Sequence, residues 1–305
     1  MSSLPSGQHL HWGAEALWQR LEPLLPGLSV EVVARADSTN TRLLERARRA
    51  SDLRDGGISR PGELDALPAQ TATPLGRRAD GVQPCLLVAE HQTDGRGRMG
   101  RGWHATVGAS LTFSLALTLA PRDWSGLSLA VGLALADALE PAADTPPRIA
   151  LKWPNDLWLI DHAGAGRKLG GILIETISVG EQRLCVVGVG LNVLPQPEHG
   201  PSAGSACLRE IAPDISAPAA LATVAEPLVR ALLRFQQLGF APLVAAYARR
   251  DLLAGQAVTT TAAGVPSGVA EGVDEHGGLR VRAGSLHTIV SGEVSVRLQP
   301  TGVAA

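Results

Sequence analysis

Residues 95–103 read Gly-Arg-Gly-Arg-Met-Gly-Arg-Gly-Trp and concentrate groups that suit an anionic ligand. Glycine has no Cβ, so the backbone of such a loop can approach a ligand closely. Arg96, Arg98 and Arg101 add permanent, planar charges that match phosphate and carboxylate oxygens. Three arginines within six residues make a poor turn unless an anion meets them. The loop therefore predicts a site that closes over a polyanion.

The same glycines also match the G-x-G-x-x-G pattern of dinucleotide-binding folds, through Gly95, Gly97 and Gly100. In those folds the third glycine opens a helix, and an acidic residue follows about 20 residues later. Here a strand-like segment follows, and residues 115–120 contain no acid. A nicotinamide cofactor is therefore disfavoured.

A second cluster is Lys152-Trp153-Pro154-Asn155-Asp156, followed by Lys168 and two glycines at 170 and 171. The residue before a proline stays extended, so Trp153-Pro154 ends the preceding strand. Asn155 and Asp156 then stand at a turn, where they can face a ligand or a hydrated Mg²⁺. An ordinary hairpin turn is the alternative. Lys168 again places a cation beside bare backbone.

A third candidate is Asp37-Ser38-Thr39-Asn40, which precedes a helix predicted over residues 41–50. Capping a helix N-terminus is a very common use of these residue types. The same side chains can also hydrogen-bond a small polar ligand, and the sequence leaves both interpretations open.

The elements that would position these residues form an α+β pattern. Residues 111–119 alternate strictly between apolar and small or polar residues, which predicts a half-buried strand. Five short strands after residue 255 predict a small β-barrel. The other predicted strands are 30–34, 85–90, 148–153, 157–160, 171–177 and 183–189, and the predicted helices are 12–25, 41–50, 127–140, 219–238 and 242–250.

Composition limits the possible functions. The 305 residues are 45% hydrophobic and 18% charged, which is typical of a soluble globular protein, and the net charge of −2 provides no field for nucleic acid or membranes. Three scattered cysteines favour a reducing compartment over a disulfide framework. We see no signal peptide in residues 1–13 and no apolar stretch long enough to span a bilayer, so we expect a cytoplasmic protein. Residues 51–84, rich in Gly and Pro, are predicted to form a flexible insertion.

Taken in order, the motifs resemble those of the bacterial biotin–protein ligases. The resemblance implies a mixed-sheet catalytic domain over residues 1–250 and an SH3-like barrel over 251–305. It rests on Asp37–Asn40, on Gln92 and the glycine–arginine loop to Trp103, on Lys152–Asp156, on Lys168–Glu175, on Gly188–Asn192 and on Gly292–Arg297.

The resemblance implies a two-step reaction. Biotin and Mg·ATP would give biotinyl-5′-AMP and pyrophosphate, and the biotinyl group would then pass to a lysine of a biotin carboxyl carrier protein. Two alternatives stay open: a lipoate- or octanoate–protein ligase of the same architecture, and a non-catalytic anion-binding module.

Roles follow from the resemblance position by position. Lys168, Arg96 and Arg98 are the implied catalytic cations. Biotin-binding roles are implied for Ser38, Thr39, Asn40, Gln92, Arg96, Gly97, Arg98 and Lys168. Roles in binding ATP or phosphate are implied for Gly95, Arg101, Lys152, Asn155, Asp156, Asn192, Glu293 and Arg297, with Asp156 reaching Mg²⁺ through phosphate or water.

The sequence departs from the family in places. Asp94 stands where many members have a small residue, and Met99 replaces a basic residue of some relatives. Only about 30 residues precede the first motif, too few for a DNA-binding domain with its own core, so we expect no DNA-binding role. Relatives dimerise through sheet edges, and a homodimer is compatible with the resemblance.

Overall fold

The computed structural model describes residues 10–54, 83–141, 146–162, 164–196, 204–290 and 296–298. Most of the predicted 51–84 insertion lies outside these residues. The helices are α1 (Ala14–Leu21), α2 (Thr39–Arg54), α3 (Leu127–Leu139), α4 (Ala217–Leu238) and α5 (Val244–Ala248), with short 3-10 turns at Arg98–Gly100, Leu208–Glu210 and Ala241–Leu243. The strands are β1 (Ser29–Ala36), β2 (Cys85–Gln92), β3 (Gly95–Arg96), β4 (Gly102–Trp103), β5 (Ser110–Thr118), β6 (Ile149–Lys152), β7 (Asp156–Ile160), β8 (Gly166–Val179), β9 (Gln182–Asn192), β10 (Ala257–Thr260), β11 (Ser267–Val273), β12 (Leu279–Ala283), β13 (Ser285–Ile289) and β14 (Val296–Leu298).

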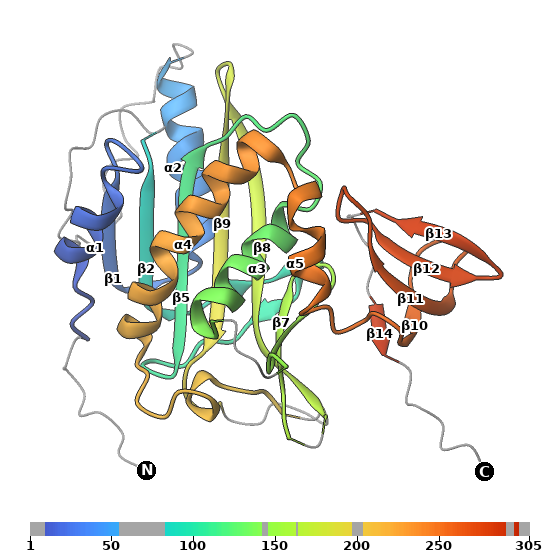
Figure 1. The fold of residues 1–305 in the computed structure, drawn as a ribbon. Coiled ribbons are helices and arrows are strands. Elements are labelled where there is room, and N and C mark those ends of the chain that lie inside the picture. The colour runs from blue at the N-terminus through green and yellow to red at the C-terminus, as the bar shows by residue number, and fades with distance from the viewer. Residues whose placement is uncertain are drawn as a thin grey trace. The chain divides into compact units, whose positions relative to one another are not determined.

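The larger sheet has the strand order β1-β2-β5-β9-β8-β7-β6 (Figure 1). β1 and β2 are parallel, whereas β2–β5, β5–β9, β6–β7 and β7–β8 pair in the antiparallel sense. The sheet is therefore mixed, which confirms the predicted α+β class. β8 is longer than the predicted strand over 171–177, because Gly166, Gly170 and Gly171 continue the pairing with β7 instead of ending it.

Contacts divide the chain into two compact units. The first holds Met1–Ala120, Leu173–Pro197 and Cys207–Glu226, and the second holds Pro121–Ile172, Glu198–Ala206 and Pro227–Ala305. The division falls within β8 and α4, so it does not test the predicted domain boundary at residue 250, which stays a prediction.

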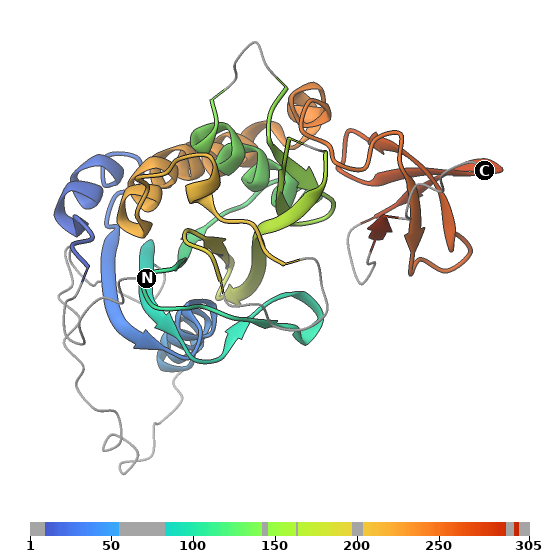
Figure 2. The ribbon, with the colours of Figure 1, turned by 90° about the horizontal axis from the view of Figure 1, so that it is seen from below.

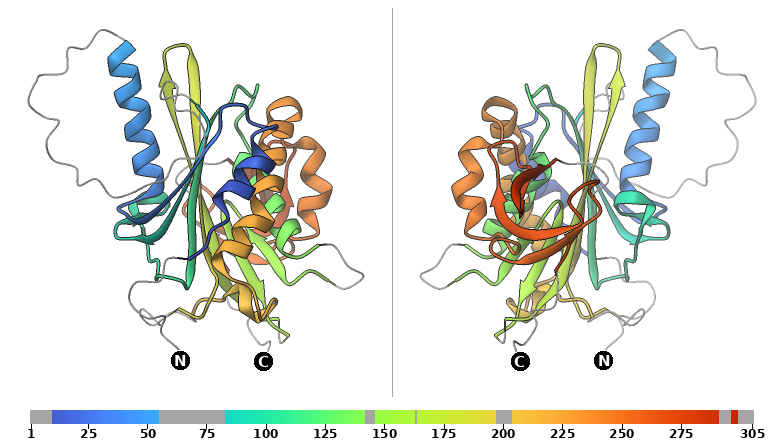
Figure 3. Two further views of the ribbon diagram at one scale, coloured as in Figure 1. Left: turned by 90° about the vertical axis from the view of Figure 1, so that its left-hand side faces the viewer. Right: turned by 90° about the vertical axis from the view of Figure 1, so that its right-hand side faces the viewer.

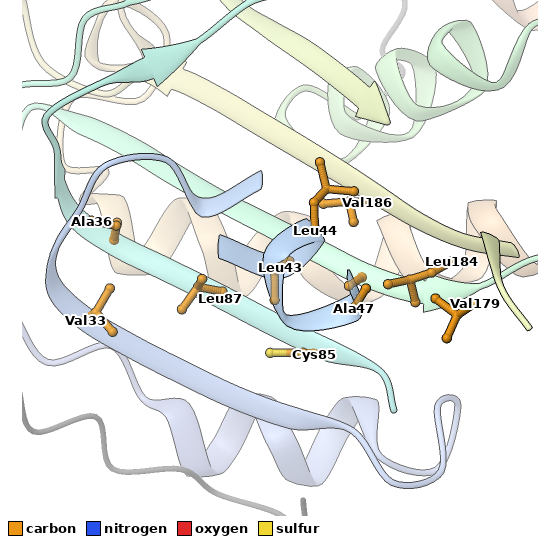
Figure 4. Close-up of a cluster of buried hydrophobic side chains, with 12 residues drawn as sticks. Val33, Ala36, Leu43, Leu44, Ala47, Cys85, Leu87, Val179, Leu184 and Val186 are labelled. Carbon is orange, nitrogen blue, oxygen red and sulfur yellow. The ribbon is translucent and has the colours of Figure 1, made fainter. Parts of the chain in front are cut away.

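In the first unit, α1 and α2 lie on opposite faces of the sheet (Figures 2 and 3). Leu43, Leu44 and Ala47 form the apolar stripe of α2 and pack on the sheet, where Leu87 and Val186 are fully buried (Figure 4). α2 begins at Thr39, two residues earlier than predicted. Thr39 and Asn40 therefore lie in the first helical turn, directed by the same packing that buries the leucines.

β5 corrects one expectation. The alternating pattern predicted a strand with one face in solvent, yet Ser110–Ala116 and Leu117 are all buried. The polar face stays inside because its hydroxyls find partners there: Thr112 Oγ1 donates to Ala89 O at 2.9 Å, and Ser114 Oγ contacts two side chains of α2. Alternation here marks a polar interior instead of a solvent-facing surface.

The second unit contains β6, β7, α3, α5 and the five-stranded antiparallel sheet β13-β12-β11-β10-β14. These five strands match the predicted small barrel, and Figure 3 shows their bent course. α4 continues through Pro227 and ends before Gly239, whose φ of 65° stops the helix. The predicted helix over 242–250 is shorter, a 3-10 turn followed by α5.

The Arg250 side chain, only 4% exposed, ties the segment before the barrel to α3 and β6. It pairs with Asp137 Oδ1 at 2.8 Å and Glu140 Oε2 at 2.9 Å, and it donates to Ile149 O. Among the described residues, no helix is long and apolar enough to cross a membrane.

Candidate active site

Ser38, Thr39 and Asn40 are each 3% exposed at the start of α2. Ser38 caps the helix: its carbonyl accepts from Arg42 N at 3.0 Å and its hydroxyl from Thr41 N at 3.4 Å. Capping therefore accounts for Ser38, whereas the side chains of the next two residues reach other elements of the first unit.

Thr39 and Gln92 meet at the end of β2. Gln92 Oε1 accepts from Thr39 N at 2.8 Å and from Thr39 Oγ1 at 3.0 Å. Ser114 Oγ lies 2.6 Å from both Thr39 Oγ1 and Asn40 Oδ1. These are three oxygen–oxygen contacts: Thr39 with Gln92, Ser114 with Thr39, and Ser114 with Asn40. Only two hydroxyl protons, those of Thr39 and Ser114, are available for them. One of these three contacts therefore has no proton of its own, whereas the Gln92 amide adds N–H donors to the network. The buried network combines hydroxyl and amide groups, and it suits a ligand that brings both N–H donors and an acceptor oxygen.

Asn40 links the network to β8 and β9. Its Nδ2 donates to Leu173 O at 3.1 Å and to Glu175 Oε2 at 3.0 Å. A Cβ on Gly188 would lie 2.2 Å from Asn40 Oδ1, so only glycine leaves room for this side chain. Gly190 likewise leaves room for the Trp103 indole, which a Cβ would approach to 2.5 Å. The glycines of the Gly-Val-Gly-Leu-Asn motif thus create space for site side chains.

The glycine–arginine loop is a small hairpin of β3 and β4. Gly97 N donates to Arg101 O at 2.7 Å, and a Cβ on Gly95 would lie 2.3 Å from Trp103 O. Met99 is 57% exposed and has a φ of 57°, a left-handed conformation that is unusual for a side chain of its size. The arginines are therefore carried by a defined backbone.

Arg96 is engaged by a carboxylate. Its guanidinium donates to Glu175 Oε1 at 2.7 Å and to Thr41 Oγ1 at 3.0 Å. The two partners of the ion pair are 42% and 23% exposed, so the pair is worth about 1 kcal/mol or less and can exchange for another anion at small cost. Asp94 N donates to Asp37 O at 3.0 Å, which fixes the entry to the loop.

The second unit brings Lys168 together with three residues predicted to bind ATP or phosphate: Lys152, Asn155 and Asp156. Lys152 and Asp156 face each other across the β6–β7 turn, and Lys168 Nζ lies 2.8 Å from Asp156 Oδ1. Asn155 exchanges two bonds with Ile172: its Nδ2 donates to Ile172 O at 2.8 Å, and its carbonyl accepts from Ile172 N at 3.0 Å. These bonds hold the turn against β8.

Both lysines of this cluster, Lys152 and Lys168, are held by a contact with a neighbouring side chain. Lys152 Nζ stands 4.5 Å from the centre of the Trp158 ring. The side chains of Lys168 and Asp156 are 43% and 23% exposed, so their pair is also a weak surface contact. Lys168 is therefore a half-exposed cation, and a ligand carboxylate or phosphate can replace Asp156 as its partner.

The remaining predicted residues are described less fully. Asn192 ends β9, is 5% exposed and stands opposite Ser110 in the register. Arg98 is half-buried in the hairpin and Arg101 is exposed. Glu293 lies outside the described residues, and for Arg297 only the backbone, paired with Thr259, is described. Within the described ranges, no group of three or more His, Cys, Asp or Glu side chains could hold a metal ion.

Two residues of the network escaped the sequence analysis. Ser114 belongs to the alternating strand, and its position on the polar face was the available clue. Glu175 ends the Lys168–Glu175 motif but had no role assigned, because its contacts with Asn40 and Arg96 depend on long-range pairing.

The fold is one found in enzymes that attach biotin to proteins. A biotin protein ligase from Aquifex aeolicus, solved in complex with biotin and ATP, superimposes with a TM-score of 0.63 at 26% identity, covering 88% of this chain and 99% of that one.

Sequence comparison identifies the family. Residues 79–192 match the biotin/lipoate A/B protein ligase family, and residues 254–297 match the biotin protein ligase C-terminal domain. A biotin–[acetyl-CoA-carboxylase] ligase of Mycobacterium tuberculosis is 35% identical over 94% of this chain and 92% of its own length. The bifunctional ligase/repressor BirA of Escherichia coli is 31% identical over 90% of this chain and 75% of its own length. The chain belongs to the biotin protein ligase family.

Proposed function

We propose that the protein is an ATP-dependent biotin–protein ligase. It activates biotin to biotinyl-5′-AMP and transfers the biotinyl group to a lysine of a biotin carboxyl carrier protein. The observation that carries the choice of substrate is the buried network of Thr39, Asn40, Gln92 and Ser114, which presents hydroxyl and amide groups in the interior.

The network favours biotin over the alternative acids. The ureido ring of biotin carries two N–H donors and a carbonyl, whereas the far ends of lipoate and octanoate carry no donor. Burying either of those against the network would leave polar groups unpaired, at a cost of about 1–3 kcal/mol for each group. Membership of the family and the relative with 35% identity support the same choice.

The proposed reaction depends mainly on stabilising negative charge and needs little covalent catalysis by the protein. In the first step a biotin carboxylate oxygen attacks the α-phosphorus of ATP, and the bond to the oxygen bridging to the β-phosphate breaks, which releases pyrophosphate. In the second step the neutral amine of the acceptor lysine attacks the biotinyl carbonyl, releases AMP and loses a proton. We assign Lys168 to the carboxylate and α-phosphate, where a fixed cation relieves the repulsion between two anions.

Arg96 and Arg98 are proposed to cover the adenylate. Arg96 would exchange Glu175 for the ligand, which costs little because their ion pair is half-exposed. A covered acyl-adenylate is kept from water, which would otherwise hydrolyse it. Gly95, Gly97 and Arg101 would bring the hairpin backbone and a further cation to the same phosphate.

We propose that Mg²⁺ enters with ATP. When bound, it would neutralise phosphate charge. Mg²⁺ in such sites keeps several waters and uses one or two carboxylates besides the phosphates, and the carboxylate of Asp156, 23% exposed beside Asn155 and Lys168, fits that role. Lys152 and Asn192 complete the proposed ATP-binding set, and Glu293 and Arg297 stay predictions.

The free cysteines Cys85, Cys185 and Cys207 are all buried, and burial raises the pKa of the Cys85 and Cys185 thiols to about 12. We propose a cytoplasmic setting, in which such thiols stay reduced. A homodimer formed through a sheet edge stays a prediction.

ATP–pyrophosphate exchange with biotin, lipoate or octanoate as the only acid tests the proposal. Exchange with biotin alone is expected. Exchange with lipoate or octanoate instead would keep the adenylation and change the substrate, and no exchange with any acid would refute the enzymatic function.

A further inference from the structure

We propose that the β11–β12 turn of the C-terminal barrel (residues 274–278) positions the Lys152–Asp156 segment for phosphate binding, acting through the indole of Trp153. The proposal rests on the function proposed above, because it concerns the same ATP-side residues. It assigns a positioning role to Trp153 and to the carbonyl of Gly277.

The contact itself is a buried hydrogen bond between distant parts of the chain. Trp153 Nε1 donates to Gly277 O at 2.9 Å, and the Trp153 side chain is 2% exposed. A buried indole N–H needs such a partner, because leaving it unpaired costs about 1–3 kcal/mol. The position of Trp153 is therefore tied to the position of this carbonyl.

The turn that presents the carbonyl is itself rigidly built. Asp274 Oδ1 accepts from His276 N at 2.9 Å and from Gly278 N at 2.8 Å. Asp274 N donates to Gly278 O at 2.9 Å, and Gly277 N donates to Asp274 O at 3.0 Å. Gly277 has a φ of 79°, which an L side chain rarely adopts. These bonds fix the direction of the Gly277 carbonyl.

The turn is also held against the segment before α3. His276 Nδ1 lies 2.9 Å from Asp123 Oδ2, and a Cβ on Gly277 would lie 2.6 Å from the Cα of Gly126. The turn thus has two contacts besides Trp153, and it can serve as a fixed support.

The support lies next to residues assigned to phosphate. Trp153 follows Lys152 and is the first residue of the three-residue turn 153–155, which ends at Asn155 and leads into Asp156. Asp156 pairs with Lys168. Mutations that misplace catalytic groups by about 1 Å can lower rates by about a hundredfold. Loosening the indole should therefore affect the ATP side of the reaction and leave the biotin-binding network, which belongs to the other unit, unchanged.

The test compares two tryptophan variants of the full chain. Trp153→Phe keeps the ring and removes the N–H. Trp18→Phe removes the same kind of bond, from Trp18 Nε1 to Leu28 O at 3.0 Å, and neither of these residues has a proposed role in the site. ATP–pyrophosphate exchange with biotin gives kcat and KM for each substrate, and thermal unfolding gives Tm.

For Trp153→Phe we expect kcat/KM for ATP to fall by about tenfold, the loss typical of one buried hydrogen bond, while KM for biotin stays within about twofold. Trp18→Phe should lower Tm about as much as Trp153→Phe does, without changing kcat/KM for ATP or KM for biotin. Gly277→Ala, which displaces the carbonyl, should mimic Trp153→Phe, and the double variant should be little worse than either.

Equal values of kcat/KM for ATP in Trp153→Phe and Trp18→Phe would overturn the inference. A loss of kcat/KM for biotin in Trp153→Phe as large as its loss for ATP would overturn it as well. If the wild-type protein itself shows no exchange with biotin, the proposed function fails instead. Equilibrium binding of a fluorescent ATP analogue then tests the positioning independently: weaker binding to Trp153→Phe than to Trp18→Phe supports it, and equal binding refutes it.

Discussion

Two cations of the proposed site are each paired with a carboxylate: Arg96 with Glu175 and Lys168 with Asp156. Both pairs are half-exposed, so they hold the cations in place without a large cost for release. The side chains are thereby oriented before the anion arrives, which reduces the ordering that binding would otherwise require.

Lys168→Ala should lower adenylate formation by about a hundredfold or more, because it removes the cation assigned to the carboxylate and α-phosphate. Its Tm should change little, since the Lys168–Asp156 pair is a surface contact. Arg49→Ala, which removes an exposed cation lying 3.9 Å from Glu45, is the control and should keep the full rate. A single-turnover adenylation assay measures both, and near-normal rates for Lys168→Ala would exclude the assigned role.

Ser114→Ala should weaken biotin binding by about tenfold, because it removes the hydroxyl that joins Thr39 to Asn40. Thr112→Val is the matched control on the same strand: it removes a buried hydroxyl whose bond goes to Ala89 O. Both variants should lose about 1 kcal/mol of stability. Isothermal titration with biotin distinguishes them, and equal affinities would show that the network does not contact the ligand.

At the scale of the elements, periodicity predicted most helices and strands but not that both faces of β5 would be buried. Thr112 and Ser114 look like solvent-facing positions in the sequence, and only the neighbouring β2 and α2 make them interior. The motif residues themselves were predictable, because glycines and cations at fixed spacing imply chemistry. The role of Glu175 was not, because it depends on how α2 and the hairpin meet β8.

The β11–β12 turn gives a pH-dependent contact. The hydrogen bond that His276 Nδ1 donates to the Asp123 carboxylate raises the pKa of His276 by more than desolvation lowers it, and the charges of Asp123, Glu275 and Asp274 also raise it. Backbone and side-chain bonds from Ser125, with the contact to His276, lower the pKa of Asp123. Protonated His276 therefore stabilises the fold fully below its ordinary pKa of about 6.5, and this contribution is lost as the pH rises through the raised value.

Thermal unfolding from pH 5.5 to 8.5 should accordingly show a Tm advantage of wild type over His276→Gln at the acidic end, shrinking toward the alkaline end. The effect should be small, because His276 is 64% exposed. A constant difference between wild type and His276→Gln across the range would contradict the ionic contribution.

At the scale of the whole molecule, the proposed biotin residues belong mainly to one compact unit and the proposed phosphate residues mainly to the other. The sequence could supply the motifs in order, but not this division, because it runs through β8 and α4 and depends on contacts between distant segments. Binding of each substrate to the native state is coupled to unfolding by mass action, so each substrate should raise Tm.

Thermal shift in the presence of substrates tests that coupling. At about 100 times its Kd, biotin alone should add about 2.7 kcal/mol, which corresponds to a Tm increase of several degrees. Biotin with Mg·ATP should raise Tm by more than the sum of the separate shifts, because the adenylate formed in place carries both groups. Chelating Mg²⁺ with EDTA should abolish the part of the Tm increase that exceeds this sum and leave the shift caused by biotin intact. Replacing ATP by an α,β-methylene analogue, which can bind but cannot release pyrophosphate, should have the same effect. An increase that persists in EDTA would remove Mg²⁺ from the proposed mechanism, and strictly additive shifts would mean that the adenylate is not retained.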